Sequence, residues 1–179
     1  MAYGNDCRTK KYTRKEIIGG IYTKTNHEIK DGNLIIEAKK DGNVYSSTKI
    51  TTKGKKEFKY GRIEIKAKMP SGVGTWPALW LLGANLLDGV AWPHCGELDI
   101  LENTGAHPFQ VQGTIHGDGY FGENGLTKII QSPTTLSSQF HTYSVNWTPD
   151  SIQWFFDDLC YNTINRVDVE SQGKHWPFD

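Results

Sequence analysis

The stretch Gly96-Glu97-Leu98-Asp99-Ile100-Leu101-Glu102-Asn103 places three carboxylates inside a segment whose other residues are typical of a buried β-strand. Carboxylates are rarely buried in a strand without a functional role. Side chains alternate between the two faces of a strand, so Glu97 and Asp99 share one face and Glu102 falls on the other. A one-residue β-bulge near Ile100-Leu101 would shift every later residue by one face. We therefore predict a bulged strand that lines one cleft with all three acids.

The spacing of the two glutamates fits one class of chemistry. With the bulge, about four strand steps separate Glu97 from Glu102, or ~13 Å between their Cα atoms. Side chains that lean together would bring the carboxyl groups to ~5–5.5 Å, which is the separation found in retaining glycosidases. A surface strand whose acids only face water would contain the same string, so the surrounding sequence has to decide between the two interpretations.

The composition limits the kinds of partner that this chain can have. Its 179 residues are the size of one domain, and twenty Lys and Arg balance twenty Asp and Glu. A net charge of zero provides no long-range field to collect nucleic acid or anionic lipid. No run approaches the ~20 apolar residues of a membrane-spanning helix. We expect an uncharged partner, and neither nucleic acid nor a membrane.

The aromatic and cysteine contents add further expectations. Aromatic residues make up 12% of the chain, with six Trp and eight Tyr, and their flat, polar-tipped rings suit the apolar faces and hydroxyl edges of sugars. The three cysteines, Cys7, Cys95 and Cys160, do not describe a disulfide framework. No Cys or His spacing suggests zinc, so no metal site is predicted. Residues 1–10 lack the apolar segment of a signal peptide.

Apolar residues alternate with polar ones at period two along most of the chain, which indicates β-strands. The predicted strands are 34–38, 44–50, 62–69, 76–82, 97–103, 109–116, 140–147 and 152–156. The first two follow turns at Asp31-Gly32-Asn33 and Asp41-Gly42-Asn43 and are expected to form a hairpin. Two turn-rich stretches, 83–96 and 117–138, flank the acidic strand and the strand after it. The pattern predicts a single all-β domain with the architecture of a sandwich.

Several motifs together resemble glycoside hydrolase family 16. They are Tyr60-Gly61-Arg62-Ile63-Glu64, Gly74-Thr75-Trp76-Pro77-Ala78-Leu79-Trp80, Trp92-Pro93-His94-Cys95-Gly96 with the acids after it, Gly113-Thr114-Ile115-His116-Gly117, Phe140-His141-Thr142-Tyr143, Trp147-Thr148-Pro149-Asp150 and Trp176-Pro177-Phe178-Asp179. The resemblance runs from about Asn33 to the end, and residues 1–30 match weakly. It implies a concanavalin-like jelly-roll sandwich of two antiparallel sheets with an open substrate cleft.

The resemblance also implies roles for the acids. Their E-x-D-x-x-E spacing resembles that of endo-β-1,3-glucanases (laminarinases) more than the shorter E-x-D-x-E spacing of lichenases. Carried over by position, Glu97 is expected to be the nucleophile and Glu102 the acid and base of a double displacement on β-1,3-glucan. Asp99 is expected to orient and tune Glu97. No cofactor is expected for this chemistry.

Five further residues are candidates for substrate binding. They are Trp76, Trp80, Trp92, His116 and Arg62. Trp76 and Trp80 have the same parity, and a core position for one of them is the alternative. Arg62 either bonds sugar hydroxyls or pairs with Glu64, and His116 either contacts substrate or serves the structure. Trp147 and Trp154 alternate as core residues do and are predicted to be structural.

Two family features are expected to be missing. Family domains usually continue past Trp176-Pro177-Phe178-Asp179 with further strands, so the resemblance implies a domain that is incomplete at its C-terminus and a monomer unless open sheet edges pair. Many family members bind a structural calcium ion, but one ligand strand of that site falls in this missing part.

Other functions remain open at this point. A lichenase-like or galactan-cleaving enzyme is the runner-up within the same class, and a β-glucan-binding protein without turnover is the alternative from a different class. An inert fragment of the fold is a third interpretation. The expected function implies secretion, although no signal peptide is recognised in this sequence.

Overall fold

The computed structural model describes residues 20–179, which fall into two compact units, 20–51 and 52–179. The smaller unit contains β1 (Gly20–Tyr22), β2 (His27–Lys30), β3 (Asn33–Ile36), β4 (Lys39–Asp41) and β5 (Val44–Ser47). β2 pairs with β3 and β4 with β5, both antiparallel, while β1 runs parallel to β5. The unit is therefore built from two short hairpins and one added strand.

The hairpin predicted between 34–38 and 44–50 is wrong. Asp31 and Gly32 both have positive φ, 51° and 74°, and their tight turn joins β3 to β2 and not to β5. The second turn, at Gly42, likewise joins β5 to its own short partner β4. β2 was missed because all four of its residues are exposed, so that no alternation of buried and exposed positions marks it.

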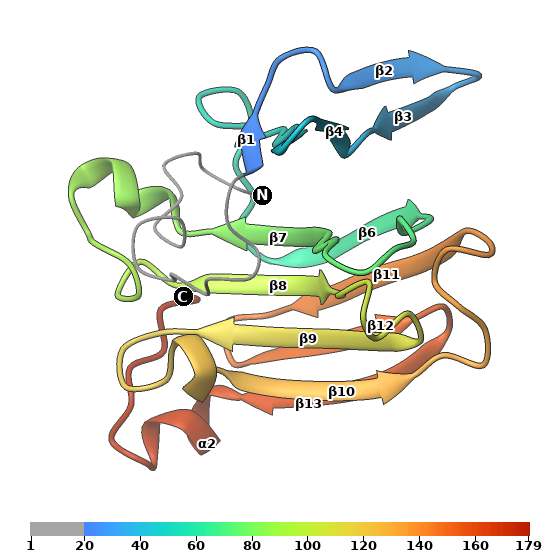
Figure 1. Ribbon diagram of the computed structural model, residues 1–179. Helices are drawn as coiled ribbons and strands as arrows, with labels where there is room; N and C mark the ends of the chain where they lie inside the picture. The colour runs from blue at the N-terminus through green and yellow to red at the C-terminus, as the bar shows by residue number, and fades with distance from the viewer. Residues whose placement is uncertain (1–19) are drawn as a thin grey trace. The chain divides into compact units, whose positions relative to one another are not determined.

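The larger unit is a sandwich of two four-stranded sheets, which Figure 1 shows face to face. The first sheet has the order β10-β9-β8-β7 and contains β7 (Ala78–Leu82), β8 (Glu97–Glu102), β9 (Gln110–His116) and β10 (Leu126–Gln131). The second sheet has the order β13-β12-β11-β6 and contains β6 (Gly61–Ala67), β11 (His141–Trp147), β12 (Ser151–Phe156) and β13 (Leu159–Asn165). Every strand pair within these two sheets is antiparallel.

The hydrophobic core lies between these two sheets. The first sheet contributes Leu98, Ile100, Leu101, Val111 and Ile115, and the second contributes Tyr143, Val145, Ile152, Trp154 and Phe156. The alternation predicted for β6 is confirmed, because Ile63, Ile65 and Ala67 pack against this core. Trp154 also belongs to it and Trp147 packs against it, as expected of structural residues. Each sheet therefore turns one face inward and one face outward.

Two strands of the larger unit were not predicted, and one begins later than expected. β10 lies inside the stretch 117–138 that was interpreted as turns, and β13 follows the last predicted strand. Both are edge strands, and β10 has no fully buried residue, so the period-two signal is weak there. β7 begins at Ala78, which leaves Trp76 in the segment before the strand.

The helical segments are short. Those among residues 20–179 are the 3₁₀ turns Ala84–Asp88 and Gly122–Asn124 and the helix α2 (Arg166–Glu170). Within the residues that the structure describes, no helix combines the length and the apolar character that crossing a lipid bilayer requires.

Candidate active site

The three acids of β8 lie on one face of the first sheet. In the ladder with β9, Glu97 pairs with His116, Asp99 with Thr114 and Glu102 with Gln112. The β9 partners are spaced by two residues and share a face, and directly opposed residues project their side chains to the same side. From Asp99 to Glu102 β8 therefore advances three residues while β9 advances two, which is the predicted one-residue bulge.

The bulge also determines what faces the core. Ile100 and Leu101 are both buried in the core cluster, so the extra residue is accommodated on the apolar side. A bulge interrupts the ladder of backbone hydrogen bonds, and the indole N–H of Trp154, on the opposite sheet, donates to the carbonyl oxygen of Asp99 at 2.9 Å. Gly113 makes room for this indole, since a Cβ there would collide with Trp154 and with the hydroxyl of Tyr161. The second sheet thus supports the strand that carries the acids.

Glu97 is held by a tryptophan from the loop before its strand. The indole N–H of Trp92 donates to Glu97 Oε2 at 2.7 Å, and both residues are almost fully buried, at 9% and 1% exposed. The peptide bond Trp92-Pro93 is cis. A short hydrogen bond to an ionised oxygen is among the stronger kinds. Trp92 therefore positions Glu97, and a stacking role for its ring stays a prediction.

Asp99 is completely buried and pairs with a histidine. Its Oδ2 lies 3.2 Å from Nε2 of His116, whose side chain is also buried. A buried carboxylate requires a partner of this kind. The predicted substrate contact of His116 stays a prediction, whereas its pairing with Asp99 is part of the structure.

Glu102 accepts hydrogen bonds at both carboxylate oxygens. Trp76 donates from its indole N–H to Oε1 at 3.2 Å, and Gln112 donates from its amide to Oε2 at 3.3 Å. Gln112 was missed by the sequence analysis. Its even spacing from His116 could have identified it, because residues 112, 114 and 116 share one face of a strand. Trp76 is still 45% exposed, so that it lies at the rim of this carboxylate face.

The structure separates the remaining candidates. Trp80 pairs in register with Asp99 and so projects from the carboxylate face, while Trp76 and Trp80 are both outside the core cluster. Arg62 is not brought to the acids. It lies on β6 of the second sheet, on the face turned away from the core, where its guanidinium pairs with Glu64 at 3.0 Å and covers the ring of Phe155. Arg62 therefore lies apart from the three acids and makes the pairing with Glu64 that was its alternative role.

An aromatic residue in contact with Trp92 was also missed. Phe121 meets Trp92 edge to face, with ring centroids 5.6 Å apart, and remains 44% exposed. It directly precedes the 3₁₀ turn Gly122–Asn124 in the stretch after β9. No period-two pattern marks a single aromatic residue in such a loop. The exposed ring extends the carboxylate face beyond Trp92.

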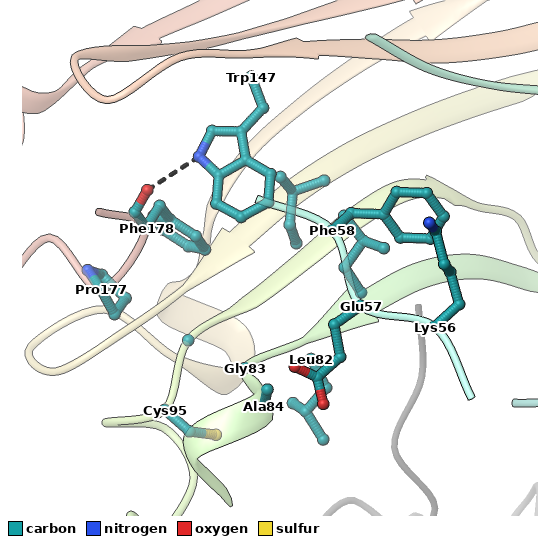
Figure 2. Close-up of a pocket in the computed structure, with 13 residues that line it drawn as sticks. Lys56, Glu57, Phe58, Leu82, Gly83, Ala84, Cys95, Trp147, Pro177 and Phe178 are labelled. Atoms are coloured by element: carbon teal, nitrogen blue, oxygen red, sulfur yellow. Dashed lines mark hydrogen bonds between the residues drawn. The ribbon is translucent and has the colours of Figure 1, made fainter. Parts of the chain in front are cut away.

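A separate apolar cavity of about 90 Å³ lies away from the acids (Figure 2). Its lining includes Phe58, Leu81, Leu98, Trp147, Pro177 and Phe178. Leu98 has the opposite parity to Glu97 and Asp99, so this cavity opens from the core side of β8. In Figure 2 the indole of Trp147 donates to the carbonyl of Phe178 at 2.9 Å. Lys56 and Glu57 also line it, but none of the three acids of β8 does, so the cavity is not part of the site.

Glu97, Asp99 and His116 could in principle offer ligands to a cation, since one atom from each lies within 4.8 Å of the others. Two carboxylates and an imidazole do not match calcium, which takes six to eight oxygen ligands. Two of the three residues already pair with each other, since Nε2 of His116 lies 3.2 Å from Oδ2 of Asp99. The geometry therefore fits carboxylate chemistry better than a calcium site.

Comparison with known proteins places this geometry in a family. The sequence profile of glycosyl hydrolases family 16 matches residues 16–179. This chain belongs to that family. The match begins within the segment 1–30, which was expected to match weakly, and the described strands β1 and β2 of that segment lie inside it.

Three similar proteins illustrate the relationship. A β-glucanase of Rhodothermus marinus is 42% identical over 177 residues, covering 94% of this chain and 59% of the relative. The crystal structure of a laminarinase from Flavobacterium sp. UMI-01 shares 46% identity with a TM-score of 0.81, covering 88% of this chain and 67% of that one. A β-1,3-glucan-binding protein of Penaeus monodon is 32% identical over 133 residues, covering 69% of this chain and 36% of the relative. The predicted jelly-roll sandwich is confirmed by the likeness to this laminarinase structure and by the sheet topology.

Proposed function

We propose that this family 16 domain hydrolyses the β-1,3 bonds of laminarin-type glucan internally, with retention of configuration. Glu97 is the nucleophile and Glu102 the acid and base of the double displacement, while Asp99 with His116 tunes Glu97. The observation that carries the proposal is the bulge, which sets Glu97, Asp99 and Glu102 on one face of the first sheet. The separation of the two glutamate carboxyl groups, ~5–5.5 Å, stays a prediction of this mechanism.

The proposed reaction proceeds in two balanced steps. In the first, a carboxylate oxygen of Glu97 bonds to the anomeric carbon as the glycosidic C–O bond breaks, and the proton of Glu102 passes to the departing oxygen. In the second, Glu102 takes a proton from water, the water oxygen bonds to the anomeric carbon, and Glu97 is released. Burial of both glutamates, at 1% and 6% exposed, supports these roles because charge interactions are stronger where water is excluded.

The direct experiment compares wild-type protein with Glu97→Ala on laminarin, with release of reducing ends as the readout. We expect hydrolysis by the wild type and none by the variant, and full activity of Glu97→Ala would remove Glu97 from the mechanism. Addition of azide to Glu97→Ala should yield a glycosyl azide of inverted configuration, because a small anion can replace the lost nucleophile. Parallel assays on mixed-linkage glucan and agarose separate the laminarinase from the lichenase-like and galactan-cleaving alternatives.

Binding of β-glucan without turnover is the second candidate. The observation in its favour is the similarity to the Penaeus monodon protein, whose name describes binding. The intact acids Glu97, Asp99 and Glu102 argue for hydrolysis instead. Retention on insoluble β-1,3-glucan together with an absence of new reducing ends would establish this second candidate. If the protein neither binds insoluble β-1,3-glucan nor releases reducing ends, both candidate functions are overturned.

A further inference from the structure

Two neutral donors, one from each side of its strand, hold the two carboxylate oxygens of Glu102. Trp76, in the segment before β7, donates to Oε1. Gln112, which is the ladder partner of Glu102 on β9, donates to Oε2. Such a pair of fixed donors limits rotation of the carboxyl group, which is otherwise a broad torsion. The orientation of Glu102 is therefore set by elements on both sides of its strand.

The amide of Gln112 is itself anchored. The same Nε2 lies 3.4 Å from Oγ1 of Thr114, and that hydroxyl shares a hydrogen bond of 3.0 Å with Thr127 on β10. Glu102, Gln112, Thr114 and Thr127 form a continuous polar row across β8, β9 and β10. A half-buried amide whose Nε2 has two fixed acceptors is a better positioning group than one that is free to rotate in water.

The two donors differ in one chemical respect. An indole N–H can only donate, whereas a side-chain amide carries both donors and an acceptor. When Glu102 is protonated, its carbonyl-type oxygen is the better acceptor, so the Trp76 N–H at Oε1 favours the proton on Oε2. Gln112 can follow the change and keep its anchor, because a half-turn of the amide presents its carbonyl oxygen both to the O–H group of Glu102 and to the hydroxyl of Thr114, which can also donate.

We propose that Trp76 and Gln112 act as a clamp that assigns the transferable proton to Oε2 of Glu102. This inference rests on the proposed function and deepens it, since it names two positioning residues for the acid and base. In glycosidic cleavage the Oε2–H bond breaks as the proton passes to the leaving sugar oxygen, and Oε2 takes a proton from water in the second step. Throughout, Oε1 keeps its hydrogen bond to the indole.

The kinetic test separates proton donation from folding. Gln112→Leu and Trp76→Phe remove one donor each, and Gln110→Leu is the matched control, because Gln110 lies two residues earlier on β9 and pairs with Gln131. The two substrates are laminarin and a dinitrophenyl β-laminaribioside, whose leaving group needs no proton. The ratio kcat/KM is compared because it includes only the steps up to the glycosyl-enzyme.

We expect Gln112→Leu and Trp76→Phe to lower kcat/KM on laminarin by about tenfold to a hundredfold. On the dinitrophenyl glycoside the same variants should stay within about threefold of wild type, and Gln110→Leu should do so on both substrates. Equal losses on the two substrates would indicate a merely structural role, and unchanged laminarin hydrolysis would also overturn the clamp.

A spectroscopic test does not depend on turnover. The indole Nε1–H resonance of Trp76 is assigned in a ¹⁵N–¹H spectrum by its disappearance in Trp76→Phe. We expect it to move upfield in Glu102→Gln, because the acceptor loses its charge, and to move in Gln112→Leu but not in Gln110→Leu. If the Trp76 resonance moves in neither Glu102→Gln nor Gln112→Leu, the clamp is overturned. If the wild type hydrolyses neither substrate yet this resonance moves as expected, the proposed function fails and the clamp stands.

Discussion

Each sheet of the sandwich turns one face away from the shared core, and the charged residues on these two outward faces differ in how deeply they are buried. On the first sheet, Glu97, Asp99 and Glu102 are 1%, 0% and 6% exposed. On the second sheet, the side chains of Arg62 and Glu64 are 46% and 53% exposed and pair with each other. Both faces follow from the same period-two alternation of charged residues. Charge alone therefore does not distinguish a candidate site from a solvated surface.

Burial and the type of partner make the difference. An exposed ion pair such as Arg62 with Glu64 contributes at most about 1 kcal/mol to folding. On the first sheet the carboxylates are kept from water and held by indole, amide and imidazole groups, namely Trp92, Trp76, Gln112 and His116. Crowding like charges in this way costs stability, and proteins retain such an arrangement where function depends on it.

The largest expected effect comes from neutralising Glu97 on the first sheet, compared with the same change at Glu64 on the second. Glu97→Gln should lower laminarin hydrolysis by roughly 10⁴-fold or more. The same change should raise the free energy of unfolding by about 1 kcal/mol, because it removes a buried charge beside Asp99 and keeps an acceptor for the Trp92 indole. Initial rates on laminarin and thermal melts monitored by circular dichroism measure the two effects.

Glu64→Gln is the matched control on the second sheet. It should leave hydrolysis unchanged and alter the free energy of unfolding by less than about 0.5 kcal/mol. A fall in stability for Glu97→Gln, or a loss of hydrolysis for Glu64→Gln, would contradict the contrast between the two faces.

The next effect tests how the second sheet supports the acids. Gly113→Ala should lower the free energy of unfolding by about 1–3 kcal/mol, because the added methyl group collides with Trp154 and Tyr161. Trp154→Phe removes the indole N–H that reaches the carbonyl of Asp99 and should cost a similar amount. Urea melts of the two single variants and the double variant measure the coupling.

In the double variant the smaller phenyl ring leaves space for the methyl group. The combined loss should therefore fall short of the sum of the single losses by about 1 kcal/mol. Strict additivity would show that Gly113 and Trp154 do not act on the same contact.

Much of this arrangement could be predicted from the sequence, for a physical reason. The strand E-L-D-I-L-E is buried on both sides, so only one placement of its acids keeps them out of the apolar core, and that placement requires the bulge. The core residues of β6, β11 and β12 were predictable because one face of each strand is buried and alternation is strong there. Arg62 and Gln112 show the limit. Parity assigns a residue to a face of its own strand, but not to one sheet or the other.

The missed strands and residues have a common cause. β10 and β2 are largely exposed and therefore carry no regular apolar signal. Gln112 is an uncharged residue whose role depends on its register with Glu102, and register across a bulge cannot be read from composition. Phe121 lies in a loop, where neither period applies. Sequence patterns reveal what is buried by regular structure, and these positions are determined by pairing and by loop geometry.

A smaller effect sharpens the boundary of the carboxylate face. Phe121→Ala should raise KM for laminarin roughly fivefold with little change in kcat, since the exposed ring beside Trp92 offers about 1 kcal/mol of contact to a sugar. Phe140→Ala is the control, because Phe140 is similarly exposed, at 48% against 44%, and its ring is covered instead by Lys68. Equal KM values for the two variants would place Phe121 outside the substrate path.

The smallest effect concerns an ion pair intermediate between the two faces. His141 is buried, and its Nδ1 lies 2.9 Å from Oδ2 of Asp157, which is about half exposed. Burial acts to raise the pKa of Asp157, but the backbone N–H of Thr142 and the hydrogen bond and charge of His141 together hold that pKa below its ordinary value of 3.8. The carboxylate therefore stabilises the fold above pH 3.8, and this contribution is lost as the pH falls through the lowered value.

Asp157→Asn removes this contribution at every pH. The melting temperature of the variant should lie below that of wild type near pH 6, and the gap should close as the pH falls through the lowered pKa of Asp157, where the wild-type carboxylate is also protonated. Asp158→Asn, at the exposed neighbouring position of the same turn, should show no such gap. A difference between wild type and Asp157→Asn that stays constant with pH would mean that the turn depends on the shape of this side chain and not on its charge. In that case a half-exposed pair would resemble Arg62 and Glu64 more than Asp99 and His116, and burial of both partners would be the condition for a functional charge in this sandwich.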